Sequence, residues 1–412
     1  MKKKYIALIV LAAAAIVMIA GYFIIAALTK EPEPEEEIIF FTDSVTELTV
    51  KYDGEEMTFG KKNGEWVYLK DENFPLNTAY LRDMNNALLS VVATGRIESD
   101  DLAEFGLDDP DCEIYAKTGD GKTFTCLLGD KNDTANVVYV LYNGSIYTVD
   151  DGFSKKFRHS FIEMARKDEL IDVQASEVEN VEITNSSGTF SLTKEPKYLE
   201  LEWKTDGIYA DTTEVKRLVD AVASLKATES LVYAPDDMTL ERYSIGEASV
   251  VLTAKDGRKA QVRFGKSVSD GSVIGYIVET DLICAFKEQD TLAVTAAKKD
   301  DFLNRVLLPV AYSEDGSAEI TAYGKTVKYD FSDYESCWDF YYKLSTIRAD
   351  AFAKEMPLGS DVKVTVKAGG EEFEINLVKY NSDFYAADVL GTVKLINKRD
   401  VEELLTIAEI RN

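Results

Sequence analysis

The stretch FGLDDPDCEIYAKTGDGKTFTCLLGD, residues 105–130, has the pattern of a β-hairpin. Apolar side chains alternate with polar ones on both sides of Asp120-Gly121, a dipeptide that favours a tight turn. The pattern returns as YSIGEASVVLTAKDGRKAQVRFGK at 243–266 and as PLGSDVKVTVKAGGEEFEINLVKY at 357–380. Alternation on both arms indicates a hairpin with one buried face. Three copies of one pattern predict a repeated architecture rather than a single catalytic turn.

The similarity continues on both sides of each hairpin. Downstream, VDDGFSKKF (149–157), FKEQDTLAV (286–294) and INKRDVEEL (396–404) align without gaps. Each of these three segments predicts the end of a strand, a polar turn and then a helix. Upstream, residues 78–97 and 212–231 both carry apolar side chains at helical spacing, so a helix is expected before the hairpin as well.

Short strands around Trp66 and Trp203 precede the upstream helices, and the third copy lacks such a strand. We therefore predict an α+β fold, in which an N-terminal transmembrane helix is followed by a tandem array of three antiparallel hairpin-plus-helix repeats. The repeats are expected at 45–170, 171–312 and 313–412, with the last one shortened.

The N-terminal segment YIALIVLAAAAIVMIAGYFIIAAL, residues 5–28, carries no charge. A helix of this length spans a bilayer core of about 30 Å. Lysines at positions 2–4 precede it, which places the N-terminus in the cytoplasm and the bulk of the chain outside. A cleaved signal peptide is the competing interpretation, but its apolar region is usually shorter. We predict cytoplasmic lysines and a single-pass anchor in the cell membrane over residues 1–30.

The acidic sequence EPEPEEE at 31–37 combines proline with like charges, which extends a chain, so we predict a Pro-rich stalk over 31–44. The whole chain has 73 acidic and 46 basic residues and a net charge of −27. Such a charge opposes binding to nucleic acid. We therefore expect no nucleic-acid partner, and contact with the membrane only through residues 5–28.

The G-L-D-x-P element at Gly106–Pro110, the Asp120-Gly121 turn and the L-G-D element at Leu128–Asp130 resemble a bacterial repeat family catalogued as domain of unknown function 4340. The second copy departs from this pattern, with Ser-Ile-Gly at 244–246. The resemblance implies no known activity. It implies proteins that are membrane-anchored or exported, some of them similar in setting to auxiliary proteins of gliding-motility-type ABC transporters.

Motifs for chemistry are weak in this chain. AKTGDGKT at 116–123 matches a relaxed phosphate loop, but a strand follows it where that chemistry needs a helix. His159 is the only histidine, and no G-x-S-x-G nucleophile motif accompanies it. One histidine with scattered cysteines does not make a typical zinc site. We therefore predict no catalytic, cofactor-binding or metal-binding residues.

Two cysteines lie on opposite arms of the first hairpin. Cys112 aligns with Val250 of the second copy, and Cys126 aligns with Val262. With a loop over 117–121 the two cysteines face each other directly. The sequence leaves two interpretations open, namely a pair of facing thiols acting as small hydrophobic groups and a cross-strand disulfide.

The helix expected at 332–347 is unusually aromatic. Alignment with the second copy places four of its side chains in the core: Tyr334, Trp338, Tyr341 and Leu344. Phe340 and Tyr342 fall off this stripe. We expect these two to pack on a neighbouring copy or, if they are exposed, to form a contact for a partner or a glycan.

The repeated positions are turn glycines, strand apolar residues and helix stripes, and no reactive group recurs among the copies. The leading hypothesis is a non-enzymatic, membrane-anchored extracytoplasmic accessory or scaffold protein, serving an ABC transporter or envelope assembly and bound to a membrane protein complex. A cell-wall glycan-binding module is the first alternative. A hydrolase with an unrecognised site is the second.

Overall fold

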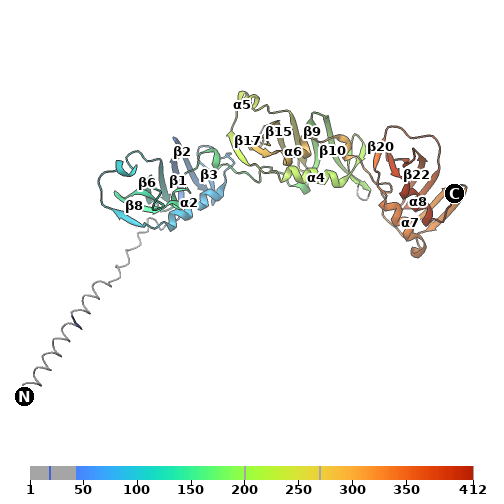
Figure 1. Cartoon of the computed structure of the whole chain (residues 1–412), viewed down its shortest axis with the longest axis horizontal. Helices are drawn as coiled ribbons and strands as arrows, with labels where there is room; N and C mark the ends of the chain where they lie inside the picture. Colours follow the sequence, from blue (N-terminus) through green and yellow to red (C-terminus); the bar gives the residue numbers. More distant parts are fainter. Residues whose placement is uncertain (1–17, 20–42, 199–200, 269–270, 412) are drawn as a thin grey trace, which may run out of the picture. The chain divides into compact units, whose positions relative to one another are not determined.

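The computed structural model describes residues 18–19, 43–198, 201–268 and 271–411 (Figure 1). The chain divides into two compact units, Met1–Met164 and Ala165–Asn412. One antiparallel sheet forms the first unit, and two antiparallel sheets form the second.

The first unit is built on an eight-stranded sheet with the order β3-β2-β1-β5-β6-β7-β8-β4. Its strands are β1 (Val45–Tyr52), β2 (Glu55–Lys62), β3 (Glu65–Tyr68), β4 (Gly95–Ile97), β5 (Cys112–Thr118), β6 (Thr123–Asn132), β7 (Val137–Tyr142) and β8 (Ser145–Asp150). Its helices are α2 (Thr78–Ser90) and α3 (Asp151–Ser154), with short 3-10 turns η1 (Ala103–Phe105) and η2 (Ile162–Met164).

The second unit begins with a nine-stranded sheet of order β12-β11-β10-β9-β14-β15-β16-β17-β13. Its strands are β9 (Val178–Asn185), β10 (Gly188–Tyr198), β11 (Leu201–Thr205), β12 (Ile208–Ala210), β13 (Glu229–Tyr233), β14 (Ala248–Ala254), β15 (Lys259–Ser267), β16 (Ser272–Ile277) and β17 (Leu282–Lys287). Its helices are α4 (Thr212–Ala223), α5 (Asp237–Arg242) and α6 (Glu288–Thr295), with 3-10 turns η3 (Ala175–Glu177) and η4 (Lys299–Phe302).

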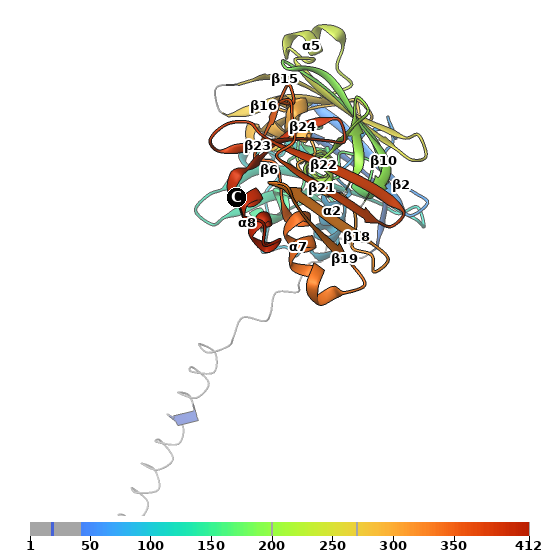
Figure 2. The same ribbon diagram turned by 90° about the vertical axis from the view of Figure 1, so that its right-hand side faces the viewer.

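The last sheet along the chain has seven strands in the order β19-β18-β21-β22-β23-β24-β20. Its strands are β18 (Ser317–Ala322), β19 (Lys325–Asp330), β20 (Ala351–Ala353), β21 (Val362–Ala368), β22 (Glu371–Lys379), β23 (Phe384–Val389) and β24 (Thr392–Asn397). Helices α7 (Tyr334–Thr346) and α8 (Lys398–Ile407) share one buried cluster with it and lie beside it in Figure 2.

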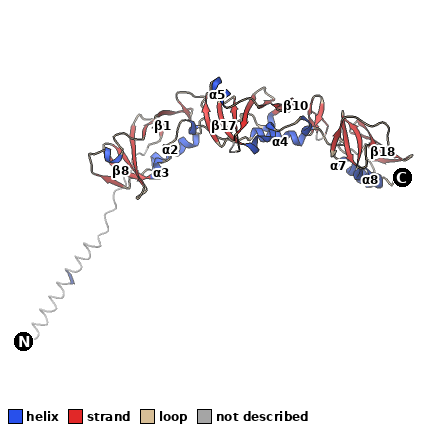
Figure 3. Ribbon diagram, turned by 45° about the horizontal axis from the view of Figure 1, so that its top comes forward, coloured by secondary structure: helices blue, strands red, loops and turns tan. Residues whose placement is uncertain are grey.

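The expected α+β array with a transmembrane helix and helical repeats is wrong as a fold class, because the protein is mostly β (Figure 3). The hairpins do not stay separate. In the first sheet β1 pairs with both β2 and β5, which joins two hairpins into one continuous sheet. Local alternation predicts a hairpin but carries no information on this second pairing.

Among the described residues, no helix is both long enough and apolar enough to cross a membrane. The segment 5–28, to which the sequence assigns the anchor, lies outside the described residues except for positions 18 and 19.

A glycine in the L-G-D element allows a close backbone approach. A Cβ atom on Gly129 would lie 2.2 Å from the carbonyl oxygen of Phe105, and one on Gly265 would lie 2.3 Å from that of Tyr243. Real Cβ atoms do not come this close to a carbonyl oxygen. The turn before the central hairpin can therefore pack directly against the strand backbone only because glycine is present. The L-G-D element therefore serves packing.

We expect Gly129→Ala to lower the free energy of unfolding by about 1–3 kcal/mol, since backbone must move to admit the methyl group. Gly119→Ala is the matched control, because its Cβ would meet only the Thr46 methyl group at 3.6 Å. Urea unfolding followed by tryptophan fluorescence compares them. Equal stability of the two variants would contradict the packing role.

Candidate functional site

Helix α7 presents a row of three aromatic side chains, Tyr334, Trp338 and Tyr342, called the aromatic row below. Positions four apart lie on one helix face, so the three rings are neighbours. Tyr334 is 51% exposed and Tyr342 is 57% exposed, while Trp338 is partly buried. Contiguous exposed aromatic groups of this size are typical of interaction sites.

The three rings stack along the helix. Tyr334 and Trp338 lie 4.8 Å apart between ring centroids, with 24° between their planes. Trp338 and Tyr342 lie 6.0 Å apart, with 30° between planes. The two tyrosines precede and follow the indole along the helix, and Tyr334 stacks on it while the Tyr342 ring is tilted beside it.

Tyr312, in the segment before β18, supports the aromatic row from beneath. Its ring meets Trp338 edge-on at 5.7 Å and Tyr334 edge-on at 5.8 Å. It also stacks on Phe331 at 5.2 Å, and its hydroxyl donates a hydrogen bond to the Phe331 carbonyl oxygen. These contacts hold the aromatic row in one arrangement before any partner arrives, which lowers the entropic cost of binding.

Carboxylates surround the aromatic row. Glu335 and Asp339 of α7, Asp333 at its N-cap and Glu314 of the preceding loop are all exposed. The nearby Lys343 points instead to α8, where its Nζ lies 2.6 Å from an Asp400 oxygen and 2.7 Å from a Glu403 oxygen. The face therefore combines aromatic rings with negative charge, a combination that favours lysine and arginine side chains.

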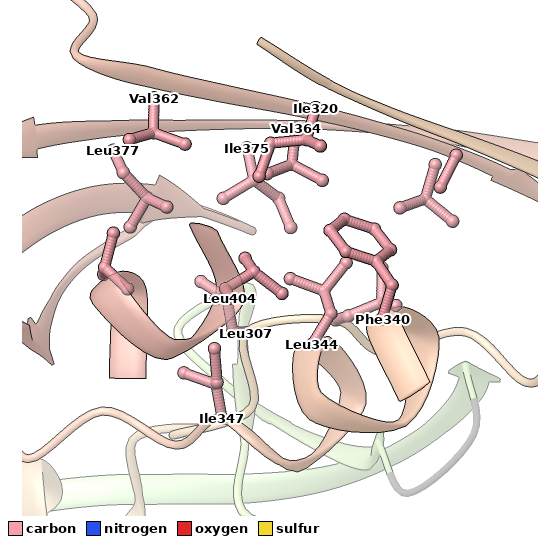
Figure 4. Close-up of a cluster of buried hydrophobic side chains, with 14 of the residues drawn as sticks. Leu307, Ile320, Phe340, Leu344, Ile347, Val362, Val364, Ile375, Leu377 and Leu404 are labelled. Atoms are coloured by element: carbon pink, nitrogen blue, oxygen red, sulfur yellow. The ribbon is translucent and has the colours of Figure 1, made fainter. Parts of the chain in front are cut away.

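Phe340 is not part of this surface, so the exposure on which its expected contact role depended is not met. The side chain is 0% exposed and stacks on Tyr329 of β19 at 4.4 Å. Figure 4 shows it directed into the core beside Ile320 and Val364. The contact role of Tyr342 remains a prediction.

The expected position of Phe340 outside the core stripe is wrong because the assumed alignment of α7 with α4 is out of phase. α4 begins at Thr212 and α7 begins at Tyr334, so Phe340 corresponds to the buried Leu218. The alignment of the two helices is three residues out, and for this reason it places the exposed Tyr334 in the core. Trp338 is partly buried and packs against the core, and Tyr341 and Leu344 are buried as expected. The signal for the aromatic row was present in the sequence as three large aromatic residues at intervals of four.

Cys112 and Cys126 lie on one buried face but do not face each other. Cys112 pairs with Leu128, and Cys126 pairs with Ile114. The turn spans residues 118–122 rather than 117–121, so the strands are shifted by two positions relative to the expected register. Cys112 consequently corresponds to Ala248 of the second sheet and not to Val250.

Diagonal neighbours in a sheet are about 7–8 Å apart, which exceeds the separation that a disulfide normally spans. Both cysteines are free thiols. Burial raises the pKa of Cys112 to about 12 and raises that of Cys126 further. A thiol that keeps its proton is a poor nucleophile, so both behave as small apolar groups.

An open groove of about 530 Å³ lies between α2 and α3 in the first unit. Its charged lining residues are Asp83, Asp150 and Lys156. Asp150 accepts a hydrogen bond from the Gly152 amide as the N-cap of α3, and the Lys156 Nζ lies 3.5 Å from an Asp83 oxygen. Each charged group thus has a structural partner.

Lys394 of β24 is fully buried, with 0% of its surface exposed. It alternates with Thr392 and Ile396, so it points to the core face of the third sheet. Its Nζ donates to the Val389 carbonyl oxygen at 3.3 Å. Burial lowers the pKa of Lys394 to about 7, while the Asp388 carboxylate acts in the opposite direction.

We expect Lys394→Met to raise the free energy of unfolding at pH 7. Between pH 7 and about 10.5 the unfolded chain binds a proton that the folded chain does not, so wild-type stability rises by about 1.4 kcal/mol per pH unit over that range. The advantage of Lys394→Met should therefore shrink from pH 7 to pH 9 in urea unfolding.

Lys367→Met, at an exposed position of β21, is the control and should change stability by less than about 0.5 kcal/mol. A constant difference between Lys394→Met and wild type across this pH range would show that Lys394 is charged in the folded protein.

In the described ranges no three His, Cys, Asp or Glu side chains gather into a metal-binding group. The fold is that of a multi-sheet antiparallel β protein, and helix α7 beside its last sheet carries the aromatic row. Residues 66–238 match the model of the family described as Domain of unknown function (DUF4340). The match contains the G-L-D-x-P and L-G-D elements and confirms the resemblance seen in the sequence. The comparison with curated proteins gave no match.

Proposed function

We propose that the protein is a non-enzymatic accessory or scaffold protein that docks a protein partner through the aromatic row of α7. The observation that carries this proposal is the stack of Tyr334, Trp338 and Tyr342, which is exposed and yet held in place from below. Tyrosine and tryptophan are enriched among the residues that supply most of the binding energy in protein interfaces.

The stacking geometry favours a protein over a glycan. A sugar ring packs on a free aromatic face, and the Trp338 indole is partly buried, with Tyr334 stacked on it and Tyr342 tilted beside it. Ring edges and hydroxyl groups remain for contact, and these suit peptide backbone and basic side chains. The exposed carboxylates Asp333, Glu335 and Asp339 favour a partner segment that contains lysine or arginine.

The uncharged segment 5–28 and the lysines before it support a location at the cell membrane, with the folded units outside the cytoplasm. A partner at that surface belongs to a membrane protein complex, such as an ABC transporter or an envelope assembly. The proposal that the protein is not an enzyme is supported by the α2–α3 groove, where capping and an ion pair occupy the charged groups.

We expect Trp338→Ala with Tyr342→Ala, in the full chain in its native membrane, to reduce crosslinking to its partner at least tenfold. Loss of two central aromatic groups typically costs more than 2 kcal/mol of binding free energy. Crosslinks mapped by mass spectrometry should join α7 to a segment rich in lysine or arginine. Tyr380→Ala, at an exposed tyrosine directly after β22, is the matched control.

Two results would overturn this proposal. Retention of the purified protein on insoluble cell wall, lost in the double variant, would assign the aromatic row to glycan binding. Hydrolysis of peptidoglycan, ester or peptide substrates, abolished by changing a single carboxylate or serine, would make the protein an enzyme.

The location has its own test. We expect protease added to intact protoplasts to digest residues 45–412, because the positive flank holds only the N-terminus inside. Protoplasts lysed before digestion are the control for protease sensitivity. Protection of the folded units in intact protoplasts would contradict the orientation.

A further inference from the structure

The three sheets differ at one outer edge. In the first sheet β3 pairs with the outer side of β2, and in the second sheet β11 pairs with the outer side of β10. In the third sheet β19 is the last strand, and no described strand pairs with its outer side. The chain passes from β19 directly to α7, which begins four residues after Asp330.

The pairing register shows that β2, β10 and β19 occupy equivalent places. The central hairpins supply three corresponding residues: Ile114, Val250 and Val364. Their partners on the next strand are Val50, Ile183 and Ile320. These in turn pair with Met57, Phe190 and Val327. The outer side of β19 is thus the position that β3 and β11 fill in the other sheets.

The exposure of the β19 side chains also indicates that a covering strand is missing at this position. Met57 and Phe59 of β2 are buried, and they correspond to Val327 and Tyr329 of β19. Val327 and Tyr329 are only partly buried, because no outer strand covers them. A half-covered apolar pair at a sheet edge is a place where additional side chains can be buried.

At this edge, backbone amides of β19 point outward and can hydrogen-bond to an added strand. The Phe331 amide donates to the Gly316 carbonyl oxygen at 3.0 Å, so the amides of odd-numbered β19 residues point toward β18. The amides of Thr326, Lys328 and Asp330 therefore point outward. In the first sheet the residue equivalent to Lys328 is Thr58, whose carbonyl oxygen accepts the Leu69 amide at 2.9 Å.

The two ends of the edge limit the site. At one end the Lys325 Nζ donates to the Arg411 carbonyl oxygen at 3.3 Å, and at the other Tyr312 stacks on Phe331. Phe331 stands where Lys61 and Lys194 face Trp66 and Trp203 in the other sheets, so Tyr312 supplies an aromatic ring at that end. A strand of about six residues fits between these ends.

We propose that the outer edge of β19 binds an extended segment of a partner protein, which pairs antiparallel as an added strand of the third sheet. The segment carries apolar or aromatic residues at alternate positions, which cover Val327 and Tyr329. It carries an acidic residue opposite Lys325, whose Nζ bonds to a carbonyl oxygen. Lys328 is already paired with Glu319 at 2.9 Å, and lysine on an edge disfavours indiscriminate pairing. This site is separate from the aromatic row and goes beyond the function proposed above.

The chain itself provides a probe, the peptide NGEWVYLKD with the sequence of residues 63–71, which contains β3. In the first sheet the amides of Val67 and Leu69 face β2, while those of Trp66 and Tyr68 face away. We expect a fluorescent form of this peptide to bind the full chain. N-methylation at the Val67 and Leu69 positions should weaken binding at least tenfold, whereas N-methylation at the Trp66 and Tyr68 positions should preserve it.

Two variants assign the binding to β19. Lys328→Pro removes one outward amide without removing a hydrogen bond to β18, so it should abolish peptide binding. Lys328→Ala keeps the amide and should retain binding, as should Trp338→Ala in the aromatic row. If Lys328→Pro fails to fold, the pair of N-methylated peptides carries the test alone.

Three results would overturn the proposal. Equal binding by both N-methylated peptides would exclude strand pairing. Absence of binding up to about 1 mM peptide would show that the edge is closed. A concentration-dependent dimer of the full chain, abolished by Lys328→Pro, would assign the edge to a second copy instead of a partner.

Discussion

The central antiparallel hairpin of each sheet, together with the strand pair that docks on it, is the constraint on which the remaining structure depends. β5 and β6, β14 and β15, and β21 and β22 form these hairpins, and β1, β9 and β18 pair with their first strands. Buried side chains then alternate in register across four strands. Because a slip of one residue would turn every apolar side chain to the other face, the register and the core specify each other.

Helices cover the face that this register makes apolar, and they have little freedom in doing so. In the third sheet α7 packs Phe340 and Leu344 against the face of the sheet that carries Ile320 and Val364 (Figure 4). Because core packing fixes the orientation of the buried side of α7, it also fixes the exposed side. The position of the aromatic row is therefore a direct consequence of core packing. The buried cluster beneath α7 and the ring of Tyr312 together hold the aromatic row in place.

The sequence predicts local elements well and their combination poorly. Alternation and the Asp120-Gly121 and Asp256-Gly257 turns correctly predict hairpins, because both signals lie within a few residues. The pairing of β1 with β5 joins residues about 60 positions apart, and no local pattern encodes it. The fold class was wrong for this reason, since separate hairpins with helices were expected in place of continuous sheets.

Errors at single residues have a similar origin. A turn centred one residue later moves the partner of Cys112 from Cys126 to Leu128. Because α7 starts three residues from the assumed place, Phe340 lies in the core and Trp338 is only partly buried. Such positions depend on where a turn or a helix begins, and cap and turn signals locate these boundaries less precisely than periodicity identifies the element.

The pairing of β1 also has a mechanical consequence. The chain enters the first sheet through an interior strand, bonded on one side to β2 and on the other to β5. Hydrogen bonds in antiparallel pairs run perpendicular to the strands, so a pull along β1 from its N-terminal end shears both ladders at once. An edge strand in the same place would have only one ladder to resist the load. A tether attached before Val45 therefore transmits force into the most firmly bonded part of the first sheet.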